Sequence, residues 1–259
     1  LAEYQKRRLY FAVGGITVTL NFAHRGFSGQ FPENTMLAFE KAVEAGADGI
    51  ELDVQFSKDG ELVIMHDETL NRTAGVDGFV KDYTLEQLKA MDVSGKWGDR
   101  YGSMEIPTLR EYFEHFKDLP VITNIELKTG IFPYPGIEER TLEMIREYEL
   151  ENKIIISSFN HYSCLKMKEL DEKMPCGLLE ESWIVGAGKY GRKLGMDFLH
   201  PAYPMVTESY VQDAVDHGLK VNTWTVNDWD SMEYFTKIGV NAIIGNFPDL
   251  AEKALNPYR

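Results

Sequence analysis

Two pairs of polar residues follow short apolar runs, and the spacing within each pair puts its side chains on one face. Glu51 and Asp53 are two residues apart, as are Glu126 and Lys128. Because alternate residues of a strand point the same way, three carboxylates are expected to face one site. Clustered buried carboxylates are unfavourable unless a positive group joins them. One divalent cation, Mg²⁺ or Ca²⁺, would satisfy them; the other interpretation is a salt-bridge network with Lys128 and Arg25.

Two histidines and an arginine are expected beside these carboxylates. His24 and His66 also follow apolar runs, and histidine is the usual general acid or base near neutral pH. Arg25 offers a fork of N–H donors that suits a phosphate, whereas Arg72, in a loop, is better interpreted as an exposed ion pair. With Lys128 and a cation, this set predicts hydrolysis of a phosphate ester, and a diester is favoured over a monoester by a small margin.

The other histidines and the two cysteines show no pattern that indicates catalysis. Histidines in helical or loop segments are expected to be hydrogen-bonded structural residues: His115, His161 and His217. His200 is left undecided. Neither Cys164 nor Cys176 lies in a CxxC pattern, so both are expected to be buried free thiols.

The elements that must position these residues alternate between short β-rich runs and amphipathic helical stretches, which predicts a parallel sheet of βαβ units. The expected strands are Val18–Ala23, Gly49–Phe56, Leu62–Met65, Val121–Leu127, Ile154–Ser158, Gly177–Leu179, Phe198–His200, Leu219–Thr225 and Ala242–Gly245. Helices are expected around 36–43, 108–116 and 137–148. A length of 259 residues suits one (β/α)8 TIM barrel, whose active site lies at the carboxyl ends of its strands.

The strand Leu62–Met65 is one more than a barrel needs. The segment 57–60 is too short for a parallel crossover, so this strand is expected to pair antiparallel with its predecessor. A two-residue Asp59-Gly60 turn would place Asp53 opposite His66. Glu51, Asp53 and His66 would then share one face, and the other face would carry Val54, Phe56, Val63 and Met65.

The chain is expected to form a single catalytic domain, residues 15–259, with an insertion at about 67–105. The insertion follows the hairpin and carries a short helical turn near 85–88, so we interpret it as a small cap over the barrel mouth. Residues 1–14 are interpreted as a tag remnant or a frayed N-terminus. The chain begins with Leu rather than Met, which leaves open a removed signal peptide.

Charge and hydropathy exclude several classes of partner. The net charge of −14 argues against nucleic-acid binding, because the chain would be repelled by phosphate backbones. No apolar run approaches the roughly 20 residues that span a bilayer, so no stable membrane insertion is expected. Free cysteines and the lack of a clear export signal favour a cytoplasmic location. The oligomeric state is left open.

An ordered series of motifs closely resembles the glycerophosphodiester phosphodiesterase family, whose α/β barrel is similar to that of phosphatidylinositol-cleaving phospholipases C. The matching segments are His24-Arg25-Gly26, Pro32-Glu33-Asn34-Thr35, Glu51-Leu52-Asp53-Val54, Lys58-Asp59-Gly60, His66-Asp67-Glu68-Thr69-Leu70-Asn71-Arg72-Thr73, Pro107-Thr108-Leu109, Ile125-Glu126-Leu127-Lys128, Trp224-Thr225-Val226-Asn227 and Asn246-Phe247-Pro248-Asp249. They span nearly the whole chain in the family's order.

The resemblance implies a role for each residue of the site. Metal ligands would be Glu51, Asp53 and Glu126. The acid–base pair would be His24 and His66, while Arg25 and Lys128 would hold the phosphate. Glu33 would steady the site, and Trp224 would form a wall for the glycerol moiety, unless it is simply a barrel-core aromatic.

The implied reaction is metal-dependent hydrolysis of a small-molecule glycerophosphodiester to sn-glycerol 3-phosphate and an alcohol. His66 would protonate the leaving alcohol, and His24 would deprotonate the nucleophile. That nucleophile is either water or the substrate's own glycerol hydroxyl, which would give a cyclic phosphate. The alternatives are lysophospholipase D-type cleavage of acylated diesters, a non-catalytic phosphate-binding barrel and a metal-dependent sugar isomerase.

Overall fold

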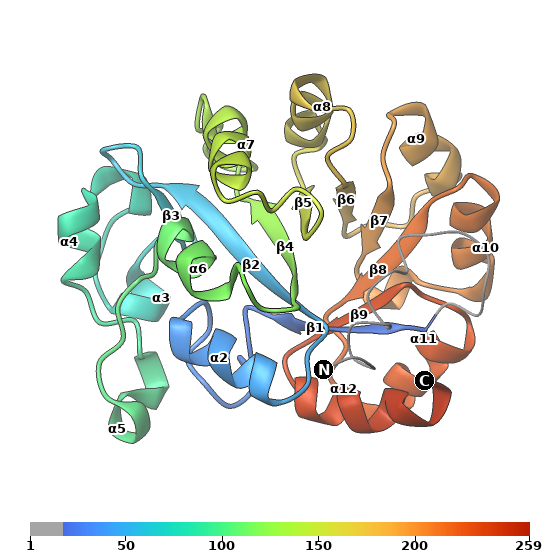
Figure 1. The fold of residues 1–259 in the computed structure, drawn as a ribbon, viewed down its shortest axis with the longest axis horizontal. Helices are drawn as coiled ribbons and strands as arrows, with labels where there is room; N and C mark the ends of the chain where they lie inside the picture. The colour runs from blue at the N-terminus through green and yellow to red at the C-terminus, as the bar shows by residue number, and fades with distance from the viewer. Residues whose placement is uncertain (1–17) are drawn as a thin grey trace.

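A closed parallel barrel forms the body of the protein (Figure 1). The computed structural model describes residues 18–259; the interpretation of residues 1–14 lies outside them. In this part of the chain, eight parallel strands pair in sequence, and β1 pairs with both β9 and β2 to close the ring. The predicted (β/α)8 fold is confirmed.

The strands fall where the apolar runs predicted them, with ends that differ by two residues at most. They are β1 (Leu20–His24), β2 (Gly49–Phe56), β3 (Leu62–Ile64), β4 (Ile122–Leu127), β5 (Ile154–Ser158), β6 (Cys176–Glu180), β7 (Phe198–Pro201), β8 (Lys220–Trp224) and β9 (Ala242–Gly245). Each parallel pair except the closing pair β1–β9 is joined through a connection that contains a helix, as parallel strands require.

Helices surround the barrel and begin at side-chain caps in several cases. The crossover helices are α2 (Met36–Glu44), α6 (Leu109–Phe116), α7 (Ile137–Glu147), α8 (His161–Leu170), α9 (Ala187–Lys193), α10 (Glu208–Asp216) and α11 (Trp229–Lys237), and α12 (Pro248–Leu255) follows the last strand. In α6 the Thr108 hydroxyl accepts from the amide of Glu111, whose carboxylate accepts from the amide of Thr108. This reciprocal cap ends the preceding loop and starts the helix.

Two apolar layers hold the barrel together. The larger lies between the outward face of the strands and the helices, and it includes Phe39, Ile50 and Phe113. A smaller cluster inside the barrel includes Phe22 and Phe198. Removing this apolar surface from water is the main favourable term in folding, at about 25 cal/mol per Å². Packing in these two layers fixes where each strand ends, and it therefore fixes the positions of the site residues at the strand ends.

The hairpin between β2 and β3 exists, but its predicted register was wrong by one residue. Val54 lies opposite Ile64, and Phe56 lies opposite Leu62; the Met65 amide donates to the Asp53 carbonyl. Three residues form the loop instead of two, because Gly60 adopts a left-handed φ of 82° and the Ser57 amide pairs with the Glu61 carbonyl. A three-residue loop with left-handed glycine is a common hairpin turn.

The corrected register changes which apolar residues share a face. Leu62 and Ile64 pack in the main core with Val54, whereas Val63 and Met65 pack in a separate cluster. The predicted grouping of Val63 and Met65 with Val54 was therefore wrong, because a shift of one residue exchanges the two faces of a strand.

The segment between β3 and α6 forms a small layer of its own, at the left of Figure 1. Its elements are α3 (Asn71–Ala74), η1 (Val80–Asp82), α4 (Leu85–Lys89), η2 (Gly95–Trp97) and α5 (Gly98–Tyr101); two further 3₁₀ turns, η3 (Tyr203–Met205) and η4 (Asn256–Tyr258), lie elsewhere. Leu70, Val80 and Leu88 are fully buried here with Val63 and Met65. The segment thus has a separate apolar core.

Among the described residues, no helix is both long enough and apolar enough to cross a membrane. Both cysteines are free and buried, as predicted.

Candidate active site

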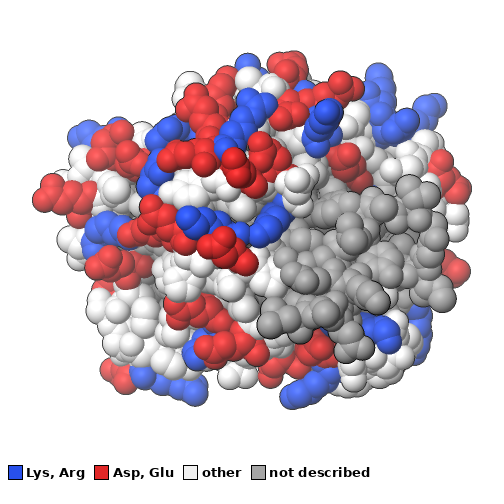
Figure 2. Space-filling model, viewed as in Figure 1, with Lys and Arg blue, Asp and Glu red and all other residues white. Residues whose placement is uncertain are grey.

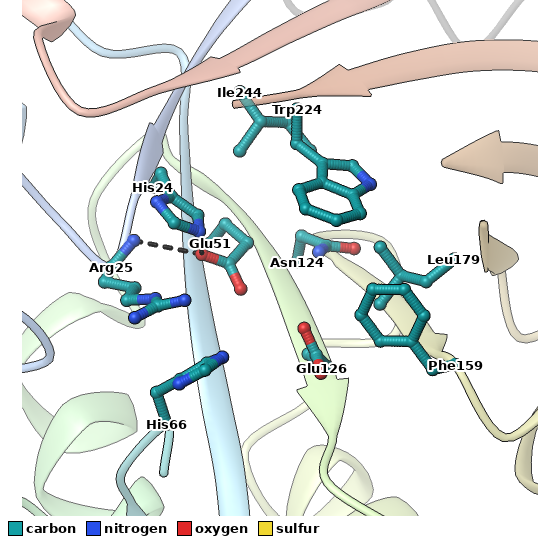
Figure 3. Close-up of a pocket in the computed structure, with 10 residues that line it drawn as sticks. All are labelled: His24, Arg25, Glu51, His66, Asn124, Glu126, Phe159, Leu179, Trp224 and Ile244. Carbon is teal, nitrogen blue, oxygen red and sulfur yellow. Dashed lines mark hydrogen bonds and ion pairs between the residues drawn. The ribbon is translucent and has the colours of Figure 1, made fainter. Parts of the chain in front are cut away.

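A pocket with one polar and one apolar side opens at the carboxyl ends of the barrel strands (Figure 3). Its combination of apolar walls and a few convergent polar groups is typical of a small-molecule site. The residues that line it are His24, Arg25, Glu51, His66, Asn124, Glu126, Phe159, Leu179, Trp224 and Ile244. In Figure 3 the two histidines and Arg25 lie across the pocket from Phe159, Leu179 and Trp224.

Three buried carboxylates meet at the floor of this pocket, and the strand pairing explains why. Glu51 and Asp53 alternate along β2, and the parallel register places Asp53 directly beside Glu126 of β4. One oxygen from each carboxylate lies within 4.8 Å of the others. This spacing allows all three to contact a single cation.

The cluster carries more negative charge than its cationic neighbours offset. Burial raises the pKa of Glu51 well above its ordinary value, and Asp53 and Glu126 raise it further. Burial and Asp53 also raise the pKa of Glu126, although its carboxylate accepts from Lys128 Nζ at 2.9 Å. Burial opposes ionisation of Asp53 too, but Arg25 Nε, 3.5 Å away, helps to lower its pKa overall.

One buried oxygen of this cluster lacks a hydrogen-bond donor. Asp53 Oδ2 accepts from Asn34 Nδ2 at 2.9 Å. Asp53 Oδ1 has no hydrogen-bond partner among the described residues, and Lys128 Nζ is 4.0 Å from it. A buried acceptor without a donor is costly. The salt-bridge network is thus present but incomplete, and these oxygen donors fit a hard divalent cation.

His24 is held so that its ring can accept a proton. Its Nδ1 lies 2.7 Å from Asn246 Oδ1, and Ser28 Oγ donates to the same oxygen. Because Asn246 presents an acceptor, Nδ1 carries the ring proton and Nε2 is the basic atom. Nε2 lies 3.9 Å from Glu51 Oε2. Burial and the charge of Arg25 lower the pKa of His24 to about 4, so the ring is neutral at pH 7.

His66 faces the same pocket from the turn after β3. Its Nδ1 lies 2.7 Å from Asp67 Oδ1. Burial opposes ionisation of Asp67, but His66 and Arg72 together hold its pKa well below the ordinary value. Asp67 is therefore a carboxylate at neutral pH, and its contact with Nδ1 orients the ring.

A buried glutamine fixes the backbone that carries His66. Gln55 Nε2 donates to the carbonyl oxygens of Met65, His66 and Asp67 at 2.9, 3.2 and 2.9 Å. Gln55 Oε1 accepts from Tyr134 Oη at 2.9 Å. The side chain thus ties β2 to the turn after β3 and to the loop after β4.

A chain of ion pairs connects the arginine of the pocket to the second histidine. Arg25 Nη1 donates to Glu33 at 2.9 Å. Arg72 then donates to both oxygens of Glu33, at 2.8 and 2.7 Å, and to Asp67 at 2.6 Å, which contacts His66. Arg72 forms ion pairs, as predicted, and 48% of its side chain is exposed. It lies on the short helix α3 rather than in a loop, and it links two parts of the site.

The His-Arg-Gly turn needs an unusual backbone. Arg25 has a left-handed φ of 54°, as does Gly26 at 76°, and the Arg25 amide donates to Glu51 Oε2 at 3.0 Å. A Cβ at Gly26 would come within 2.7 Å of the backbone of Ala38. A side chain at position 26 would collide with α2, so glycine is required for α2 to pack against this turn.

The apolar side of the pocket is built around Trp224 at the end of β8. Its Nε1 donates to the carbonyl of His200 at 2.8 Å, and its ring contacts that of Phe159 edge-on, with centroids 5.5 Å apart. Trp224 lines the pocket and also packs against the apolar cluster inside the barrel. His200 is fully buried and contacts Asn222 at 3.0 Å, so its role is structural.

The three remaining histidines lie outside the pocket lining and have local partners. His161 contacts Tyr190 and the Leu179 carbonyl. His217 contacts the Asp213 carbonyl, and His115 lies 3.3 Å from Glu40.

The structure brings together all nine residues that the sequence singled out. Six line the pocket, and Asp53, Lys128 and Glu33 contact those six. Among the polar neighbours that were not predicted are Asn34, Asp67, Asn124 and Asn246. Asn124 precedes Glu126 by two residues on β4, so the alternation of side chains along a strand could have identified it. Asn34, Asp67 and Asn246 stand in the motifs that resemble the family, but their hydrogen-bond partners depend on how the loops fold.

A parallel α/β barrel with buried carboxylates, histidines and a guanidinium at the carboxyl ends of its strands defines a class of hydrolytic enzyme site. Residues 24–250 match the model of the glycerophosphoryl diester phosphodiesterase family. The chain belongs to this family and is a phosphoric diester hydrolase that acts on glycerophosphodiesters.

Individual relatives match this chain over almost their full lengths. A glycerophosphodiester phosphodiesterase from Caldanaerobacter subterraneus subsp. tengcongensis is 45% identical over 231 residues, which cover 89% of this chain and 95% of that protein. A phosphodiesterase of Oleispira antarctica, solved in complex with the product sn-glycerol-3-phosphate, is 29% identical with a TM-score of 0.84, covering 92% of this chain and 97% of that one. A structure from Silicibacter pomeroyi, at 23% identity, shows the same fold with a TM-score of 0.86 and 95% coverage of both chains.

Proposed function

We propose that the enzyme hydrolyses glycerophosphodiesters to sn-glycerol 3-phosphate and an alcohol, using one divalent cation and a pair of histidines. The observation that carries the proposal is the cluster of Glu51, Asp53 and Glu126, whose oxygens converge beside two histidines that are each anchored through Nδ1. The product bound to the Oleispira antarctica relative supports the same reaction.

The three carboxylates would hold the cation, and Mg²⁺ and Ca²⁺ both suit oxygen ligands of this kind. A cation bound there supplies positive charge for the phosphoryl oxygens as negative charge builds in the transition state. The Asp53 oxygen that lacks a hydrogen-bond donor supports this assignment, because coordination would satisfy it.

The two histidines divide the proton transfers. His24 is neutral at pH 7, so its Nε2 takes the proton from the nucleophile. His66, whose Nδ1 contacts the Asp67 carboxylate, gives a proton to the leaving alcohol. The nucleophile is either water or the glycerol hydroxyl; the second route would give a cyclic phosphate that water then opens.

The remaining residues bind the substrate. Arg25 and Lys128 hold the phosphate, and Glu33 steadies Arg25 through the contact at 2.9 Å. Trp224 forms a wall for the glycerol moiety, with its ring fixed by the contact to the His200 carbonyl.

The segment 67–105 acts as a cap over the barrel mouth, in a catalytic domain of residues 15–259. Its support is Arg72 of α3, which contacts Glu33 beside the pocket. The free buried thiols of Cys164 and Cys176 favour a cytoplasmic location.

The test is release of sn-glycerol 3-phosphate from glycerophosphocholine and glycerophosphoethanolamine. Protein is first treated with a chelator, and Mg²⁺, Ca²⁺ or Mn²⁺ is then restored separately. Activity that returns with one ion supports the proposal and names the cofactor. Full activity after chelation would refute the metal requirement. Folded protein that is inactive with every ion but cleaves lysophospholipid micelles would favour the acylated diesters instead.

A further inference from the structure

The surface outside the pocket offers little to distinguish one phosphodiester from another. Acidic and basic side chains alternate over the insertion at the left of Figure 2, so this surface has no broad field of one sign. Arg25 and Lys128 would contact the phosphate, which every phosphodiester carries. Selection for a glycerol moiety must therefore come from other residues of the pocket.

One polar residue that lines the pocket has no role in the chemistry proposed above. The cation site, the two histidines and Arg25 account for the other polar residues of the lining in the described part of the chain. Asn124 of β4 remains, and it is 1% exposed. A buried amide is unfavourable unless it is hydrogen-bonded, so its surroundings indicate what it binds.

The Asn124 amide is only half paired. Its Nδ2 donates to Ser157 Oγ of β5 at 3.0 Å, which fixes the rotation of the side chain. Its Oδ1 has no hydrogen-bond partner among residues 18–259. If the amide were turned over, Ser157 would donate to the oxygen and the NH₂ group would be left without a partner instead. In either orientation, one strong hydrogen-bonding atom is left for a ligand.

The strand register places Asn124 between the cation site and the apolar wall. Across the sheet, Asn124 pairs with Glu51 of β2 on one side and with Ile155 of β5 on the other. In Figure 3 its side chain lies between Glu51 and the side chains of Trp224 and Leu179. A group bound to this amide would therefore adjoin both the phosphate and the wall proposed for glycerol.

A hydroxyl group suits this position. It both donates and accepts, so it pairs with the amide in either orientation, whereas an ionised phosphate oxygen only accepts. Neighbouring strands are about 4.8 Å apart, so Asn124 lies one strand away from Glu51, a proposed cation ligand. The hydroxyl must therefore be close to the phosphate. In a glycerophosphodiester the secondary hydroxyl stands on the carbon next to the ester carbon, and the primary hydroxyl is one carbon further away.

We propose that Asn124 binds the secondary hydroxyl of the glycerol moiety and thereby selects glycerophosphodiesters over diesters that lack it. The inference rests on the proposed function, which places the phosphate at the cation and the glycerol against Trp224. The Trp224 ring does not supply this polar contact, because its Nε1 donates to the His200 carbonyl. An apolar wall alone discriminates weakly, whereas a site built to hydrogen-bond a hydroxyl rejects an analogue without it.

The experiment is calorimetric titration of the full chain, with Mg²⁺ or Ca²⁺ present, with the product and two deoxy analogues. The probes are sn-glycerol 3-phosphate, 3-hydroxypropyl phosphate, which lacks the secondary hydroxyl, and 2-hydroxypropyl phosphate of the same configuration, which lacks the primary one. Loss of the secondary hydroxyl should weaken binding about 10-fold, and loss of the primary hydroxyl should weaken it less. Binding requires no bond cleavage, so the result is the same whether or not this hydroxyl is the nucleophile.

Two matched variants separate the role of Asn124 from the general effect of losing a buried asparagine. Asn124→Leu keeps the branched shape without the hydrogen bond, so it should bind sn-glycerol 3-phosphate and 3-hydroxypropyl phosphate equally. Asn21 is also 1% exposed and has an unpartnered Oδ1, but its Nδ2 donates to the Pro248 carbonyl at 2.9 Å, and it is not among the residues that line the pocket. Asn21→Leu should keep the wild-type preference.

Three results would overturn the proposal. Wild-type protein could bind the product no more tightly than 3-hydroxypropyl phosphate; this comparison needs no variant, so misfolding of Asn124→Leu cannot obscure it. Asn124→Leu could keep the preference. It could instead lose cation binding in a titration without any phosphate compound, which would make Asn124 a cation ligand. The proposed function has its own test in diester hydrolysis, so an active wild-type enzyme that fails here refutes only the role of Asn124.

Discussion

Replacing Arg72 by glutamine should lower turnover although Arg72 lies outside the pocket lining. The guanidinium holds Glu33, which contacts Arg25, and Asp67, which contacts His66. Glutamine cannot bridge two carboxylates in this way, so both catalytic side chains gain freedom. Outer residues that orient a site contribute about 10- to 100-fold to activity, and we expect a loss of kcat within that range.

The accompanying loss of stability can be worked out from the same contacts. A hydrogen bond to a charged group contributes about 1.5–3 kcal/mol when it is shielded from water. Because Arg72 is 48% exposed, screening reduces each carboxylate contact to about 0.5–1 kcal/mol. The total of about 1–2 kcal/mol corresponds to a fall in Tm of roughly 2–8 °C for a domain of this size.

Arg110 provides the control. Arg110 of α6 donates two hydrogen bonds to Glu147 of α7, at 2.7 and 3.0 Å, and 38% of its side chain is exposed. This contact joins two helices away from the pocket. Steady-state kinetics and thermal unfolding are measured for Arg72→Gln and Arg110→Gln. Both should lose some stability, and only Arg72→Gln should lose kcat. Equal kcat in the two variants would refute the idea that Arg72 positions the site.

Three further changes test the site and its surroundings. His66→Ala should lower kcat by about 10²–10⁴-fold with little change in KM; near-normal turnover in the diester assay would contradict its role as the acid. Glu126→Gln should weaken divalent-cation binding by at least the roughly 10- to 100-fold typical of an outer contact, and calorimetric titration showing unchanged affinity would count against the metal site. Lys89→Gln should lower the free energy of unfolding by less than about 1 kcal/mol, because the pair is partly exposed. Burial opposes ionisation of Glu111, but Lys89 and Thr108 lower its pKa below 4.5 overall. The stabilisation by the Lys89–Glu111 pair is therefore fully present above pH 4.5, and it is lost as the pH falls through the lower pKa of the folded state. Thermal unfolding should therefore show a difference from wild type near neutral pH that disappears in acid, and a difference that persists there would exclude the pair as its cause.

The barrel could be predicted because its signals are local. Each strand is a short apolar run, and each crossover carries a helical pattern, so the order of elements follows from the chain alone. The hairpin was identifiable because the segment 57–60 cannot span a parallel crossover. Its register was not, because the turn depends on the left-handed Gly60 and on Asp59, whose carboxylate accepts from the distant Leu85 amide at 2.9 Å.

In the site, the residues on strands could be predicted from the sequence, but the loop residues that contact them could not. Glu51, Asp53 and Glu126 lie on strands, where alternation settles their direction. The groups that orient the histidines lie on loops: Asn246 follows the last strand, and Asp67 is held by Arg72 in the insertion. Such contacts join residues far apart in sequence, and no periodic pattern reveals them.

The position of β3 has a consequence for how this enzyme could diversify. β3 pairs with the edge of β2 that extends beyond the barrel, and it takes no place in the closed ring. The segment it leads into packs around Leu70, Val80 and Leu88 instead of the main core. Insertions or exchanges beyond Arg72 would therefore leave in place the three carboxylates, His66 and the contacts that anchor it. Evolution could thus rebuild the outer part of this module while the residues that break the bond are inherited unchanged.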